Sequence, residues 1–130
     1  MNFPVGRGVD NADFEAEISI LTADQGGRTL PPLNGIRWDF AYPEDPPSFP
    51  IHMIHPFFMD DTGRVIPAEQ KLFGTLKAIM FIIAEQAVEY HRKRIFVGMP
   101  FECREGHKIV ALGTVTKLIR LDVVVPETPN

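Results

Sequence analysis

The stretch that decides the fold is Phe14-Glu15-Ala16-Glu17-Ile18-Ser19-Ile20-Leu21. Its even positions are all apolar, whereas positions 15, 17 and 19 carry two glutamates and a serine. Successive side chains of a β-strand point to opposite faces, so this alternation predicts a strand with one buried and one solvated face. The Asp24-Gln25-Gly26-Gly27 stretch that follows predicts a turn, because glycine adopts positive φ angles at little steric cost.

The next segments continue the β pattern. Residues 36–42 alternate cleanly between apolar and polar side chains and are predicted to form a second strand. The segment 52–59 is expected to form a hairpin with residues 64–66, and Asp60-Asp61-Thr62-Gly63 has the composition of the connecting turn. Late strand material is predicted over residues 118–125.

The composition fits one domain with an all-β fold. The chain has 130 residues, of which 45% are apolar and 23% charged, values that are ordinary for a soluble globular protein. Proline breaks helices, so a proline-rich connection suits long β-sheet loops better than a helical bundle. Four of the twelve prolines fall in one connection: Pro43, Pro46, Pro47 and Pro50. We expect a loose arm over residues 1–12, one β domain over 13–125 and a tail over 126–130.

The net charge is small, but the charged residues are unevenly distributed along the sequence. The formal net charge is −4, which by itself does not indicate a nucleic-acid partner. Residues 10–61 hold ten acidic side chains against Arg28 and Arg37, whereas seven basic side chains lie between residues 92 and 120. This difference is typical either of two solvated faces or of a functional basic patch.

One cysteine excludes an internal disulfide and agrees with a reducing compartment. Cys103 has the same strand parity as Phe101, so we expect a small buried side chain and not a reactive thiol. Residues 1–8 lack the apolar core of a secretory signal peptide, and the longest apolar run, residues 78–84, is too short to span a bilayer. A cytoplasmic protein without membrane contact is expected.

Motifs for catalysis, metals and cofactors are missing from the sequence. The Asp60-Asp61-Thr62-Gly63 stretch has the Asp-x-x-Gly form of GTPase switch regions, but no phosphate-binding Gly-x-x-x-x-Gly-Lys-[Ser/Thr] loop accompanies it. His52 and His55 are three residues apart, which places them on opposite faces of a strand and argues against a shared metal. We therefore expect a non-enzymatic protein without a cofactor or metal.

Two separated stretches resemble one known family. The first is the strand 14–21 followed by Gly26-Gly27-Arg28, Pro31, Gly35, Arg37 and Phe40; the second is the closing stretch 99–118 with Arg104-Glu105-Gly106 at its turn. Together they are similar, in the same order, to the third, C-terminal β-barrel domain of translation elongation factor Tu. The match covers about 30 residues at the start and 20 at the close. Only the third domain of that three-domain GTPase is represented, so the resemblance does not imply GTPase activity.

The resemblance implies an all-β fold, a small closed or nearly closed antiparallel barrel with six or seven strands. It adds strands at about 75–83, 99–104 and 108–118. Helix propensity alone would instead place a single helix across 75–94, and we allow one short helix or helical turn within 84–94. Six large apolar residues are expected to share one core: Phe14, Ile18, Trp38, Phe40, Phe101 and Val115.

The family also implies candidate binding residues. In elongation factor Tu this barrel contacts the T-stem backbone of aminoacyl-tRNA and also meets other proteins. The resemblance brings the Gly-Gly-Arg turn and the closing hairpin together at one end of the barrel. The candidate contact residues are Arg28, Thr29, Arg104, Glu105, Gly106 and Lys108.

Two positions depart from the family at this surface. Thr29 stands where the family usually has histidine, and His107 takes the place of a glycine. Both departures weaken a contact with tRNA phosphates. For Arg28 two roles remain open, a contact with a partner or an ion pair with a nearby carboxylate that only braces the turn.

Three functions follow from these observations. The first is a protein-interaction module, such as a translation-associated adapter or an immunity-type partner. The second is a translation-associated protein that binds tRNA or another RNA through a degenerate T-stem surface. The third is a small-molecule binder or enzyme that uses the barrel mouth with the proline-rich loop as a lid.

Overall fold

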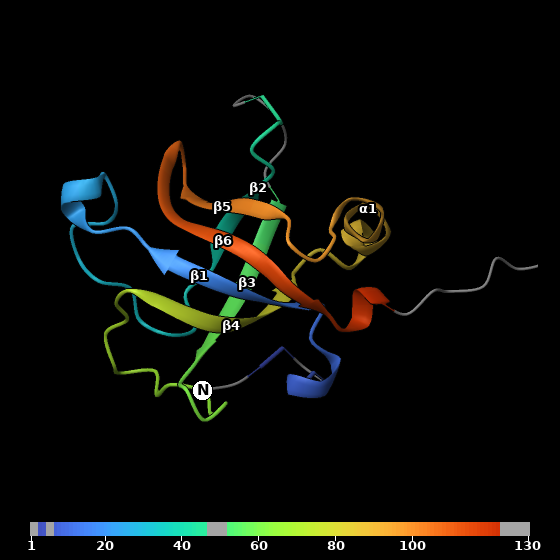
Figure 1. Ribbon diagram of the computed structural model, residues 1–130, viewed down its shortest axis with the longest axis horizontal. Coiled ribbons are helices and arrows are strands. Elements are labelled where there is room, and N and C mark those ends of the chain that lie inside the picture. The colour runs from blue at the N-terminus through green and yellow to red at the C-terminus, as the bar shows by residue number, and fades with distance from the viewer. Residues whose placement is uncertain (1–2, 5–6, 47–51, 123–130) are drawn as a thin grey trace, which may run out of the picture.

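The computed structural model describes residues 3–4, 7–46 and 52–122. The chain forms a closed antiparallel β-barrel, as the sequence predicted, with strands in the order β1-β4-β3-β2-β5-β6 (Figure 1). Closure pairs every strand on both edges and so leaves no open sheet edge. The six strands are β1 (Phe14–Ile20), β2 (Trp38–Ala41), β3 (His52–Met59), β4 (Thr75–Ile82), β5 (Pro100–Glu105) and β6 (Lys108–Leu118).

Strand β1 closes the barrel by pairing with β4 on one edge and β6 on the other. Ala16 lies opposite Ala78 in β4 and opposite Val115 in β6. The β1 burial pattern alternates as predicted, with Phe14, Ala16, Ile18 and Ile20 inside the barrel. The alternating stretch therefore sets both the first strand and its register.

Aromatic rings fill the barrel interior. Phe40 stacks on Phe101 with ring centroids 4.9 Å apart, and Phe14 packs edge-on to both rings. A Cβ at Gly113 would lie 2.2 Å from the Phe101 ring, so only glycine fits on the strand beneath it. All six residues predicted for the core belong to this one cluster, and Cys103 is buried in it as expected.

A second apolar cluster covers the outer faces of β3 and β4. Phe57 and Phe81 form its centre, and Phe3 from the N-terminal arm packs edge-on to Phe57 at 4.8 Å. Both strands are therefore buried on two faces and read as apolar runs without clear alternation. The arm that the sequence predicted as loose is thus packed on the barrel at Phe3 and Ala12.

The buried carboxylate of Asp13 contacts residues at both ends of the barrel's sequence. Asp13 is fully buried, and its Oδ2 accepts a hydrogen bond from the Ile82 amide at 2.6 Å. Its Oδ1 lies 3.2 Å from Arg7 and 3.5 Å from Arg120. The carboxylate thereby joins the N-terminal arm, the end of β4 and the turn after β6.

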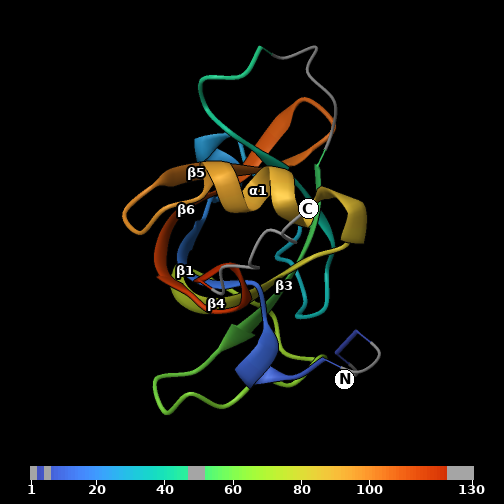
Figure 2. The ribbon, with the colours of Figure 1, turned by 90° about the vertical axis from the view of Figure 1, so that its right-hand side faces the viewer.

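The segment after β4 is helical, as the sequence allowed. A 3-10 turn, η3 (Glu85–Ala87), leads into the helix α1 (Val88–Arg94). This helix lies across one end of the barrel, and its Val88 side chain belongs to the interior cluster (Figure 2). Two other 3-10 turns, η1 (Val9–Asn11) and η2 (Ala23–Gln25), flank β1.

Two loop predictions differ in detail from the structure. Asp60 caps the predicted hairpin turn by accepting hydrogen bonds from Thr62 and Arg64, but the return segment pairs only at Val65. The late strand predicted over 118–125 is wrong for residues 119–122, which form a turn containing η4 (Arg120–Asp122). Amides of this turn bond the carbonyls of residues 12 and 13 and so bend the chain away from the sheet. Residues 123–125 lie outside the described residues.

Candidate functional site

The two turns singled out by the sequence meet at one end of the barrel. The Nε atom of Arg28 lies 3.4 Å from a carboxylate oxygen of Glu105. The indole N–H of Trp38 donates to the same oxygen at 2.9 Å. Glu105 therefore links the Gly-Gly-Arg turn, strand β2 and the closing hairpin. The ion pair with a nearby carboxylate, one of the two roles left open for Arg28, is present in the structure.

The local sequence around Arg28 builds its turn from capping groups and glycines. Thr22 and Gln25 cap η2 reciprocally, each side chain bonding the other residue's backbone amide. Gly26 ends η2 with a φ of 88°, in the left-handed region that glycine favours. A Cβ at Gly27 would lie 2.4 Å from the Leu21 carbonyl oxygen, so the chain passes close to β1 only because this residue is glycine.

The remaining predicted contact residues lie on the closing hairpin. Arg104 donates from Nε to Glu102 at 3.0 Å, so a second of the candidate cations is paired with a carboxylate. Gly106 forms the turn with a φ of 65°, and Lys108 stands opposite Glu105 in the strand register. Lys108 is exposed and forms no ion pair within the part of the chain that the structure describes.

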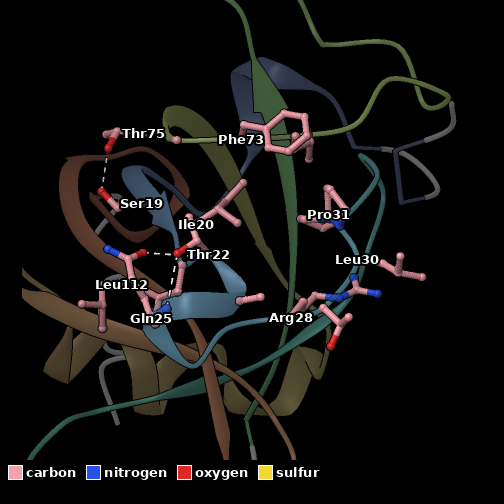
Figure 3. A pocket seen from close by; sticks show the side chains of 16 residues that line it. Ser19, Ile20, Thr22, Gln25, Arg28, Leu30, Pro31, Phe73, Thr75 and Leu112 are labelled. Carbon is pink, nitrogen blue, oxygen red and sulfur yellow. Dashed lines mark hydrogen bonds between the residues drawn. The ribbon is translucent and has the colours of Figure 1, made fainter.

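A pocket of about 670 Å³ opens beside Arg28. Its walls come from the end of β1, the segment 28–32, the residues that enter β4 and one residue of β6, Leu112. Figure 3 shows Phe73, Pro31 and Leu30 along one side of the pocket and Ile20 and Leu112 along the other. The predicted residues Arg28 and Thr29 line it; the other four predicted residues do not.

Large apolar side chains stand exposed around this pocket. Leu30 is 70% exposed, Phe73 65% and Leu112 46%. Scattered apolar residues on a surface are ordinary, but a group gathered at one concave site is typical of a binding surface. No local pattern in the sequence indicates this site, because Phe73 and Leu30 are 43 positions apart and belong to no motif.

Four polar residues of the pocket bond one another in pairs. The Ser19 and Thr75 hydroxyls lie 2.7 Å apart in a hydrogen bond, and Thr22 and Gln25 complete the cap of η2. Among the described lining residues Arg28 alone is charged, and it faces Glu105. The lining side chains thus offer mainly apolar contact.

A second cluster of titratable groups lies at the other end of the barrel, beneath α1. The Tyr42 hydroxyl is hydrogen-bonded to Nδ1 of His91 at 2.7 Å, and the Arg94 guanidinium lies 3.7 Å above the Tyr42 ring. Burial, together with the nearby charges of His52 and Arg94, lowers the pKa of His91 to about 4. Burial also raises the pKa of the Tyr42 phenol. Both side chains are 2% exposed or less, so their hydrogen bond is shielded from solvent and braces α1.

The other candidate ligands and nucleophiles lie apart. His55 bonds the Gly35 carbonyl on the outside of β3, whereas His52 packs against His91 at the barrel end. Burial raises the pKa of the Cys103 thiol, which keeps it protonated. Within the described ranges, no three histidine, cysteine, aspartate or glutamate side chains gather closely enough to hold a metal ion.

A comparison of the sequence with models of known protein families finds no match. Among the helices in the described residues, none has the length and apolar character needed to cross a bilayer.

Proposed function

We propose that this protein is a non-catalytic protein-binding module whose partner docks at the pocket beside the Gly-Gly-Arg turn. The observation that carries the proposal is the exposure of Leu30, Phe73 and Leu112 around one apolar pocket. Protein interfaces bury such side chains in a central apolar patch. A relative of the third domain of elongation factor Tu, acting in the cytoplasm as an adapter or immunity-type partner, fits this proposal.

The charges support a protein partner over RNA. RNA affinity comes largely from cations that neutralise phosphates, and those cations must be available to the backbone. At the predicted contact surface Arg28 faces Glu105 and Arg104 faces Glu102, so Lys108 contributes the remaining positive charge. Three cations against two carboxylates leave a net charge of about +1, which is small for a surface that follows a phosphate backbone.

RNA binding remains the second candidate because of one feature. The Gly-Gly-Arg turn and the closing hairpin lie side by side, as a degenerate T-stem surface would require. A small-molecule function has less support, since most of the side chains that line the pocket are apolar.

Photo-crosslinking separates these candidates. A p-benzoylphenylalanine residue replaces Phe73 at the pocket, Lys108 at the closing hairpin, or Phe96 on the loop after α1 as a control. The chain is then irradiated inside the cells that produce it. We expect adducts from position 73 that resist ribonuclease and are digested by protease, and none from position 96. Adducts that disappear after ribonuclease treatment would overturn the protein-binding proposal.

A further inference from the structure

We infer that the pocket receives an uncharged, apolar segment of a partner protein, and that the amides of Arg28, Thr29 and Leu30 hydrogen-bond the main chain of that segment. The inference rests on the proposed protein-binding function and specifies its partner. Three observations support it: the shape and lining of the pocket, the unpaired backbone on its rim, and its charge.

The lining determines which side chains can enter. A volume of about 670 Å³ lies in the range of pockets that bury most of a compact ligand, and it exceeds a single side chain. The rim residues Leu30 and Phe73 would lose much of their exposed apolar surface on contact. The hydroxyls of Ser19 and Thr75 are bonded to each other, and most of the other lining residues are apolar. Large aliphatic or aromatic side chains are the best match.

The rim also presents free backbone donors. In the described part of the chain, the amides of Arg28, Thr29 and Leu30 donate no hydrogen bond to another residue, whereas Gly27 donates to Thr22. The three residues line the pocket, so their unpaired main chain lies at its rim. Neither a lipid chain nor a hydrocarbon ligand carries acceptors for such donors, but the carbonyl groups of a polypeptide do.

The charge of the site specifies an uncharged segment. Arg28 alone among the described lining residues carries charge, and Glu105 balances it. A carboxylate brought to Arg28 would meet Glu105 as well, and a cation would meet Arg28. Binding should therefore depend little on ionic strength, in contrast to binding held by several phosphates.

Peptide selection tests whether large apolar side chains bind in the pocket. A phage-displayed library of random 12-residue peptides is selected on the intact protein, and the enriched peptides are titrated by calorimetry. We expect peptides with two or more large apolar residues, with an affinity that falls at least tenfold in Phe73→Ser and in Leu30→Ser. Phe96→Ser is the matched control, since Phe96 is 59% exposed on a loop at the other end of the barrel, and it should stay within twofold of wild type. Failure to enrich apolar peptides, or equal loss in the control, would overturn the inference.

Amide hydrogen exchange tests the backbone contact. In the complex with an enriched peptide, the exchange rate of at least one amide among Arg28, Thr29 and Leu30 should fall at least tenfold. The Val97 amide is the control, because it too is exposed and donates no hydrogen bond among the described residues. A Phe73-dependent peptide that leaves all three rim amides unchanged would overturn the backbone part of the inference.

The two proposals fail in different ways. Ribonuclease-resistant protein adducts formed from position 108 but not from position 73 would refute this docking site and leave the protein-binding function intact. Ribonuclease-sensitive adducts would refute both.

Discussion

The guanidinium of Arg28 lies 3.4 Å from the carboxylate of Glu105, 77 positions later in the sequence. The same carboxylate accepts the indole N–H of Trp38, whose side chain is 2% exposed. Glu105 thus holds the first and last turns of the barrel together and fixes one wall of the pocket. An arginine that the family resemblance assigns to partner contact is consequently an internal brace as well.

Replacement of Glu105 tests this bracing. Glu105→Ala leaves the buried Trp38 N–H without its acceptor, which should cost about 1–3 kcal/mol in the free energy of unfolding. Glu105→Gln keeps a carbonyl acceptor and removes only the partly exposed ion pair, so it should cost less than about 1 kcal/mol. Urea denaturation of the two variants makes the comparison. Equal losses would show that the ion pair, and not the indole hydrogen bond, holds the turns.

Phe40→Ala tests the interior core. Phe40 contacts Phe14, Tyr42 and Phe101 and is 2% exposed, so its truncation should lower the free energy of unfolding by about 3–5 kcal/mol. Phe96→Ala removes a ring of the same size from the surface and should change it by about 0.5 kcal/mol or less. A loss below about 1 kcal/mol for Phe40→Ala would contradict the packing described.

Asp13→Ala tests the contacts that the buried carboxylate makes with the N-terminal arm, the end of β4 and the turn after β6. The substitution removes the acceptor of the Ile82 amide and the partner of two arginines, and should cost about 3 kcal/mol. Arg120→Ala should cost about 1 kcal/mol, because Asp13 keeps its contacts with Ile82 and Arg7. Thermal unfolding monitored by circular dichroism measures both. A larger loss in Arg120→Ala would show that the contact of Arg120 with Glu85, and not the one with Asp13, stabilises this region.

The buried His91 makes stability depend on pH. Its pKa is about 4 in the folded protein and about 6.5 in the unfolded chain, so the folded state disfavours the proton. Stability is complete above pH 6.5 and falls as the pH drops toward 4, with about 2 kcal/mol lost between pH 7 and pH 5. Burial lowers the pKa of His52 and of His55 as well, which adds loss in the same direction.

Denaturation in urea at pH 7 and pH 5 measures this dependence. His91→Gln removes the titrating group and keeps an amide that can bond Tyr42, so most of the pH dependence should disappear. His107→Gln is the matched control on the exposed closing turn and should keep the wild-type dependence. Unchanged dependence in His91→Gln would show that His91 does not titrate in this range.

Much of the fold could be predicted from local pattern. The alternation of residues 14–20 determines β1, and glycine chemistry at Gly26 and Gly106 determines the two turns. The sequence pattern predicts strands β3 and β4 less clearly, since both are buried on two faces and their apolar and polar residues do not alternate. The end of β6 at Leu118 depends on backbone bonds to residues 12 and 13, which no local pattern reports.

The candidate site was less predictable, for a physical reason. The sequence indicated Arg28 and Thr29 through a family resemblance but gave no reason to join them to Phe73. The pocket exists only because barrel closure brings the segment 28–32 beside the entry to β4. An exposed apolar side chain looks the same in sequence as a buried one, so Leu30 and Phe73 became informative only when their exposure was known.

The most direct test is the salt dependence of binding by the partner crosslinked from position 73. Its dissociation constant is measured at 50 and 200 mM salt for the wild type, Phe73→Ser and Arg28→Ala. We expect the wild-type constant to change by less than about threefold between the two salt concentrations, and Phe73→Ser to weaken binding at least tenfold at both. A wild-type affinity that falls by roughly 10³ over this range, with a salt slope reduced by about 1 in Arg28→Ala, would identify phosphate contacts and contradict docking at the apolar pocket.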